Sequence, residues 1–154
     1  MRILAYEIEH ISLPDEDPNW KFAGQAYPTN DACILTIIAE DGTRGIGYGA
    51  AFPHLAATAL GVEGALQRIC AGLVGRDVMA LEANLHYMQG ALVGNHPAKA
   101  AIDCALHDLK ARLLEVPLYD LLGGKVVDRI AICRMLGLKA PHEIALAKTI
   151  LQLG

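Results

Sequence analysis

The sequence lacks any pair of cysteines at the spacing of a zinc site or a redox motif. Its four cysteines stand at positions 33, 70, 104 and 133, whereas zinc and redox cysteines usually lie about two to four residues apart. Unpaired cysteines are among the most often buried residues in proteins. We therefore expect buried free thiols, as in proteins of a reducing compartment.

Clusters of basic residues and long apolar runs are also missing. The chain has 13 basic and 17 acidic residues, a formal charge of −4, which argues against nucleic-acid binding. No uninterrupted apolar run approaches the ~18 residues of a membrane helix. Glu7, Glu9 and His10 interrupt the N-terminal segment in a way that a signal peptide does not tolerate. The sequence predicts a soluble, cytoplasmic protein that binds neither nucleic acid nor membranes.

Several enzyme motifs are absent as well: the HExxH zinc motif, the GxSxG nucleophile elbow and the GxxxxGK phosphate loop. A GxGxxA pattern does occur at Gly45, Gly47 and Ala50, with Glu63 further along the chain. In dinucleotide-binding proteins such glycines join a strand to a helix N-terminus. Here they follow a hairpin turn, so the pattern favours close packing of a strand backbone, and dinucleotide binding is a disfavoured alternative.

What the sequence does contain is the composition of a globular domain with a core. Its 154 residues are 53% hydrophobic and 19% charged. In the first half, the alternation of Leu4, Tyr6 and Ile8 with acidic residues indicates a strand with these three side chains on one face. An apolar run over 34–38 followed by Asp41-Gly42 predicts a hairpin. We expect a three-stranded antiparallel meander. The connection between its first two strands is long, and connections of this length without structure of their own are unusual and commonly either functional or disordered.

The second half has the periodicity of helices. We expect helices over about 56–74, 79–92 and 95–115, and a short one in 117–122. The third has an apolar face formed by Ile102, Ala105, Leu106, Leu109 and Leu113. A strand over 128–136 and a helix over 141–153 follow. The predicted fold is α+β, a meander with a helical bundle, followed by one β/α unit.

Two sets of polar or aromatic residues are candidates for function. Asp103 and His107 are four residues apart on the third helix, where they could ligate a metal or form a base with its orienting partner, or else belong to a structural polar face. Asp108 and Arg112 have the same spacing on that helix. We favour the structural interpretation because no third ligand is near in sequence. The aromatic residues of two loops either pack on their own domain or close over a ligand; with one histidine they are Trp20, Phe22, Phe52 and His54.

The stretch AKAAIDCALHDLKARLLEVPLYDLLGG, residues 98–124, resembles the helix signature of the mandelate racemase and muconate lactonizing branch of the enolase superfamily. The hairpin, the helices before this stretch and the strand after it also follow the family's order. The positions that fit the pattern are Ala98, Ala100, Ala101, Ile102, Asp103, Ala105, Leu106, Asp108, Leu109, Ala111, Arg112, Pro117, Leu118, Leu121, Leu122 and Gly123.

The resemblance implies that residues 1–125 form an N-terminal capping domain and that 126–154 form the first strand and helix of a truncated (β/α) barrel. The family removes the proton next to a substrate carboxylate, and Mg²⁺ stabilises the resulting enediolate. Its catalytic lysines and metal-binding acids lie on later barrel strands, so this chain would contain no catalytic residue and no metal ligand. We expect a fragment of a racemase, epimerase or cycloisomerase that is inactive alone.

The resemblance also implies a small carboxylate as substrate and two loops, about 13–31 and 50–57, that close over it. Trp20, Phe22, Phe52 and His54 lie in these loops and become candidate substrate-binding residues. The alternative is a non-enzymatic binding or assembly module derived from the cap. An unpaired barrel strand would expose an apolar edge, so we expect homo-oligomers or aggregation through it.

Overall fold

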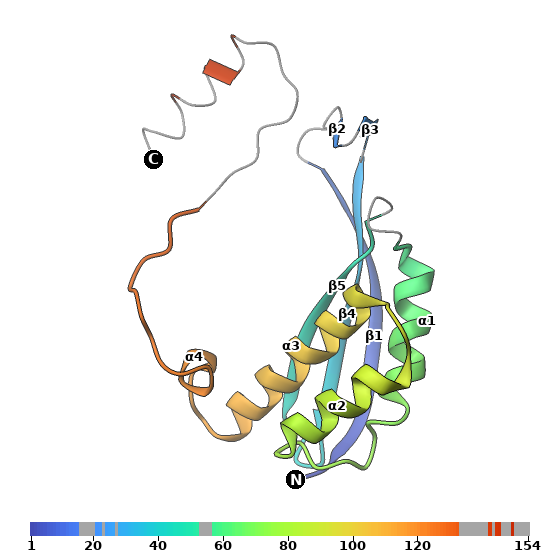
Figure 1. The fold of residues 1–154 in the computed structure, drawn as a ribbon, viewed down its shortest axis with the longest axis vertical. Coiled ribbons are helices and arrows are strands. Elements are labelled where there is room, and N and C mark those ends of the chain that lie inside the picture. The colour runs from blue at the N-terminus through green and yellow to red at the C-terminus, as the bar shows by residue number, and fades with distance from the viewer. Residues whose placement is uncertain are drawn as a thin grey trace. The chain divides into compact units, whose positions relative to one another are not determined.

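The computed structural model describes residues 1–15, 21–22, 24–26, 28–52 and 57–132, together with His142, Ile144, Ala145 and Thr149. The chain divides into two compact units, which are described separately. The first comprises Met1–Leu13 and Asn30–Lys125, and the second comprises Pro14–Thr29 and Val126–Gly154. Figure 1 shows the elements along the chain.

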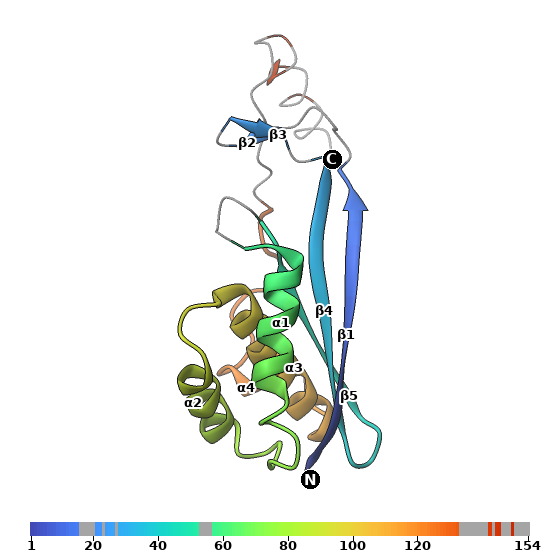
Figure 2. The same ribbon diagram turned by 90° about the vertical axis from the view of Figure 1, so that its right-hand side faces the viewer.

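The first unit contains a three-stranded sheet in the order β1-β4-β5. Its strands are β1 (Ile3–Pro14), β4 (Thr29–Ala39) and β5 (Arg44–Ala50). Strands β4 and β5 are antiparallel and form the predicted hairpin, in which Gly42 has the positive φ of 86° that its turn requires. Strands β1 and β4 also run in opposite directions (Figure 2), so the predicted meander is confirmed.

The start of β1 differs from the prediction. Tyr6 and Ile8 pack against the core, but Leu4 is 58% exposed and Ile3 is the buried residue, at 2%. The backbone of Ile3 pairs with a distant loop, donating to the Arg76 oxygen at 2.9 Å. The buried face changes parity between Ile3 and Tyr6, as it does when a strand contains one extra residue. The prediction that Leu4 shares one face of the strand with Tyr6 and Ile8 is therefore wrong.

All four predicted helices of the first unit form. They are α1 (Ala59–Cys70), α2 (Leu81–Ala91), α3 (His96–Leu113) and α4 (Leu118–Leu121). The side chain of Thr58 caps α1 by accepting a hydrogen bond from the Gly61 nitrogen at 3.2 Å. Helices α1, α2 and α3 all lie on one face of the sheet (Figure 2).

The core lies between that face and the helices. The predicted apolar face of α3 is confirmed, because Ile102, Leu106 and Leu109 are fully buried. They pack with side chains from the central strand and from α1. The largest of these partners are Leu35 and Ile37 on β4 and Leu66 and Ile69 on α1.

The second unit is only partly described. Within the connection between the first two long strands, β2 (Lys21–Phe22) and β3 (Gln25–Ala26) pair as a small antiparallel hairpin. Of the predicted strand over 128–136, Asp128–Ile132 are not in a strand and the rest lies outside the described residues. A strand needs a hydrogen-bonded neighbour, and Ile130 and Ile132 are 84% and 92% exposed.

The predicted last helix is visible only at single positions. His142, Ile144, Ala145 and Thr149 are helical, and the Thr149 hydroxyl donates to the Ala145 oxygen at 3.0 Å. Among the residues that the structure describes, no helix combines the length and the apolar character needed to cross a lipid bilayer.

Candidate functional site

The glycines of β5 make room for helix α3. A Cβ atom on Gly47 would lie 1.9 Å from the carbonyl oxygen of Ala101, and one on Gly45 would lie 2.3 Å from that of Ala105. No side chain fits at such distances, so the helix backbone packs directly on the strand. The glycines lie inside a strand and are covered by a helix, which leaves no place for a pyrophosphate. The dinucleotide-binding alternative is therefore wrong, and the packing interpretation is confirmed.

Asp108 joins α3 to β5 by hydrogen bonds. Its Oδ2 atom accepts from the backbone nitrogen of Ile46 at 2.9 Å, and both carboxylate oxygens accept from Arg112 Nε at 2.9 and 3.0 Å. The carboxylate thereby satisfies a strand N–H that would otherwise lack a partner at the sheet edge. The Asp108–Arg112 pair has the structural role predicted for it.

Asp103 and His107 also contact each other on α3. His107 Nδ1 lies 2.7 Å from Asp103 Oδ1 and 2.9 Å from the backbone oxygen of the same residue. Of the residues that the structure describes, no three His, Cys, Asp or Glu side chains are placed to hold a metal ion. This pair is part of the polar face of the helix, in which each side chain finds its partner one turn away.

Lys99 is a buried contact that sequence reasoning missed. Its side chain is only 7% exposed, and its ammonium group donates to the backbone oxygen and the side-chain Oε1 of Gln89, at 3.3 and 3.1 Å. Gln89 lies in the last turn of α2, where carbonyl groups lack partners within the helix and a positive charge is favourable. Lys99 therefore stabilises the end of α2 from the neighbouring helix.

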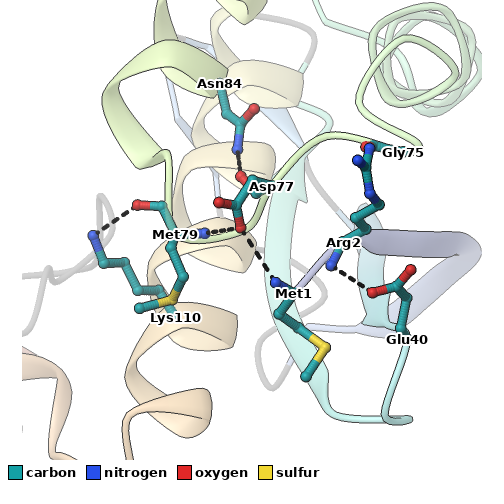
Figure 3. A network of polar contacts seen from close by, with 8 residues as sticks. All are labelled: Met1, Arg2, Glu40, Gly75, Asp77, Met79, Asn84 and Lys110. Carbon is teal, nitrogen blue, oxygen red and sulfur yellow. Dashed lines mark hydrogen bonds and ion pairs between the residues drawn. The ribbon is translucent and has the colours of Figure 1, made fainter.

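A polar network holds the N-terminal end of the sheet to the helices (Figure 3). Asp77 is at its centre: Oδ1 accepts from the Met79 nitrogen at 3.1 Å, and the backbone oxygen accepts from Asn84 Nδ2 at 2.8 Å. Asn84 is a buried polar residue, so this bond satisfies a group that water cannot reach. The other members of the network are Met1, Arg2, Glu40, Gly75 and Lys110. We therefore assign these polar residues a structural role, which is to join the start of β1 to the segment that leads into α2.

The thiols of the described residues are free but differ in exposure. Cys33 and Cys70 are buried, as expected, whereas Cys104 is exposed on α3, which corrects the prediction for that residue. Burial raises the pKa of the Cys70 thiol to about 12. Burial, and next the negative charge of Glu63, raise the pKa of Cys33. Neither buried thiol is a nucleophile at neutral pH, because the thiolate is the reactive form. Cys133 lies outside the described residues.

A cavity of about 620 Å³ lies at the other end of β5. It is bordered by the last residue of the strand and by the N-terminal ends of α1 and α3, and its walls are mainly apolar. The polar residues that line it come from three separate segments, which sequence reasoning did not connect. They are Tyr48, Thr58, Asn95 and His96. Concave, mostly apolar surfaces with a few polar groups are typical of small-molecule sites.

The structure describes only some of the four site residues that the sequence predicted. Phe52 is partly buried just after β5, and its backbone oxygen accepts from the Ala57 nitrogen at 3.3 Å. The backbone of Phe22 pairs with Gln25 in the β2–β3 hairpin of the second unit. Trp20 and His54 lie outside the described residues, as does the side chain of Phe22. The role of all four residues in substrate binding therefore remains a prediction.

Comparison with known proteins identifies the family. Residues 9–123 match the family model of the mandelate racemase/muconate lactonizing enzyme N-terminal domain, which is most of the chain. The chain belongs to this family. The resemblance inferred from residues 98–124 is thereby confirmed, and so is the α+β fold with its meander and helices.

Relatives of this mandelate racemase/muconate lactonizing enzyme domain differ in the reaction they catalyse. A cis-3-hydroxy-L-proline dehydratase of Roseibium aggregatum is 31% identical over 150 residues, covering 94% of this chain and 40% of that protein. An L-Ala-D/L-Glu epimerase of Bacillus subtilis is 32% identical over 149 residues, covering 94% of this chain and 40% of that protein. The chain thus spans about 40% of the length of these two relatives.

A solved family structure indicates magnesium. A mandelate racemase/muconate lactonizing enzyme of Roseovarius nubinhibens, complexed with magnesium, superimposes with a TM-score of 0.92 at 26% identity, covering 99% of this chain and 42% of that one. Within the described part of this chain, no three side chains of the ligating types lie close enough together to hold such an ion. The described residues therefore do not fit a magnesium site.

Proposed function

We propose that residues 1–125 are the capping domain of a mandelate racemase/muconate lactonizing enzyme and that residues 126–154 begin its barrel. The match of 9–123 to the family's N-terminal domain carries this proposal. The boundary after residue 125 is supported by the first compact unit, Met1–Leu13 with Asn30–Lys125, which ends at Lys125. The relatives that match nearly the whole chain are more than twice its length.

The proposed reaction of the whole enzyme begins with removal of the proton next to a substrate carboxylate. Racemases, epimerases, cycloisomerases and dehydratases share this chemistry, with Mg²⁺ stabilising the enediolate. We assign the enzyme to the racemase/epimerase or cycloisomerase group on the helix signature of residues 98–124. The bases and magnesium ligands belong to later barrel strands of the family, so the 154-residue chain is inactive alone.

The proposed role of this chain is to shape the substrate site. The loops over 13–31 and 50–57 close over a small carboxylate, and Trp20, Phe22, Phe52 and His54 contact it. The cavity beside the second loop supports this role, because Ala50 and Ala57, at the two ends of that loop, line its wall. Loops carried by a rigid scaffold are the usual carriers of specificity.

A chimera tests this function. Residues 1–125 would replace the equivalent N-terminal domain of the Bacillus subtilis L-Ala-D/L-Glu epimerase, whose own barrel supplies the chemistry. We expect a folded enzyme that epimerises the dipeptide with an altered KM. In the chimera, Phe52→Ala changes the KM several-fold, and Leu60→Ala, at a 75% exposed position on α1, does not. A folded, active chimera in which both variants behave alike would contradict the loop assignment.

A further inference from the structure

The face of the sheet that the helices leave uncovered has an apolar centre. Outward-facing residues of β4 pair with outward-facing residues of β5: Ile34 with Tyr48, Thr36 with Ile46 and Ile38 with Arg44. Ile46 and Tyr48 are 50% and 46% exposed. The solvated face of an antiparallel sheet is usually polar. An exposed apolar centre on such a face is typical of a surface that binds a partner.

Charged residues border this apolar centre with opposite signs on its two sides. Glu7 of β1 and Arg44 of β5 form an ion pair across β4, beside Ile38. The next residue on the same side of β1, Glu9, is also exposed. The β1 side of the face is therefore acidic, and the β5 side carries a basic residue at the same level along the strands.

Pairing of another strand with the edge of β5 is blocked at Ile46. The nitrogen of Ile46 already donates to Asp108, a residue of that helix. A partner that covers Ile46 and Tyr48 must therefore approach the open face of the sheet. Two sheets that pack face to face lie about 10 Å apart with their strands within about 30° of one another.

We propose that this face binds the same face of a second copy of the chain, about a two-fold axis parallel to β4. This axis places β4 opposite β4, and β1 opposite β5 of the second copy. Arg44 of each copy then faces Glu7 of the other, and the isoleucines of β4 form the dry centre of an isologous interface. A two-fold axis across the strands would instead place like charges opposite each other, which is unfavourable. The proposal does not depend on the enzymatic function.

A charge-swap experiment on the purified 154-residue chain tests the arrangement. Glu7→Arg gives two positive residues at this level of the face, and Arg44→Glu gives two negative ones. Sedimentation velocity over a concentration series measures the dimer dissociation constant, and circular dichroism checks that each variant is folded. We expect a dimer for the parent chain and a dissociation constant raised at least about tenfold for each single variant.

The decisive step is to mix the two variants. In the proposed dimer each charge of one variant faces an opposite charge of the other, so the mixture associates with an affinity within about threefold of the parent. Loss of the internal Glu7–Arg44 pair is the same in the mixture as in the separate variants, so it cannot produce this recovery. Glu82→Arg, the same change at an exposed position on α2, leaves association unchanged.

Three results would overturn the proposal. The first is a parent chain that stays monomeric at tens of micromolar, and the second is a mixture that remains as dissociated as its components. The third comes from a pair of apolar-to-lysine variants: Ile46→Lys on the proposed face and Leu60→Lys on α1, where the leucine is 75% exposed. Ile46→Lys abolishes the dimer in the proposed arrangement, and equal effects of both variants would contradict it.

Discussion

The two faces of strand β5 differ in the size and the exposure of their residues. The inner face carries Gly45, Gly47 and Gly49, all buried, because the backbone of α3 lies against the strand. The outer face carries Arg44, Ile46 and Tyr48, all exposed. Contacts within the chain determine the residues of the inner face. On the outer face Tyr48 also borders the cavity, whereas nothing in the described part of the chain requires an apolar side chain at Ile46, so we attribute that side chain to the proposed second copy.

The largest effect is expected on the inner face. Gly47→Ala places a methyl group 1.9 Å from a backbone oxygen of α3, which has to move, and we expect a loss of about 3 kcal/mol or more in unfolding free energy. Urea unfolding measures it. The matched control is Gly64→Ala on α1, where the new methyl meets no described atom within 4 Å. We expect that control to gain about 0.5–1 kcal/mol from helix propensity. Equal stability of the two variants would contradict the packing of α3 on β5.

An intermediate effect is expected for the hydrogen bonds of the same interface. Asp108→Ala leaves the Ile46 nitrogen and the Arg112 guanidinium without their acceptor, and we expect a loss of about 1–3 kcal/mol. Asp108→Asn retains one acceptor oxygen and should lose less. Thermal unfolding of both variants shows whether Asp108→Ala loses more stability than Asp108→Asn. If Asp108→Asn were less stable than Asp108→Ala, the hydrogen bond from the Ile46 nitrogen to Asp108 would not account for the contribution of this residue to stability.

The smallest effect is expected on the outer face. Ile46→Thr keeps a β-branched side chain at a 50% exposed position, so the monomer should change by no more than about 0.5 kcal/mol. The measurement requires dilute protein, because dimer formation would add to the apparent stability. A loss as large as that of Gly47→Ala at high dilution would show that the outer face is part of the monomer core.

The sequence predicted best those elements whose formation depends on residues close together in the chain. The hairpin at Asp41-Gly42 depends on one turn, and the buried face of α3 depends on the spacing of its own apolar residues. The exposure of Leu4 could not be predicted, because it follows from the pairing of Ile3 with a loop more than 70 residues away. The burial of Lys99 likewise follows from a tertiary contact, its hydrogen bond to Gln89 of α2, which the spacing of residues within α3 does not reveal.

The loop residues of the candidate site, such as Phe52, were selected first because they are aromatic residues in polar loops. The family resemblance then added the expectation that these loops close over a substrate. The cavity beside Ala50 could not be foreseen, since Asn95 and His96 reach it from the start of a helix some 45 residues further along the chain. Family membership, in contrast, was readable from residues 98–124 because the signature lies within one helix and the turn after it.

We propose that this chain is a cap that carries substrate-facing loops and that the proton-abstracting groups belong to later barrel strands of the family. The most direct test incubates the purified 154-residue chain with L-Ala-D-Glu and Mg²⁺ in deuterated water and follows the α-protons by NMR, with the Bacillus subtilis epimerase as positive control. We predict no exchange above the rate without protein. Exchange catalysed by the chain and abolished by a chelator would contradict the account.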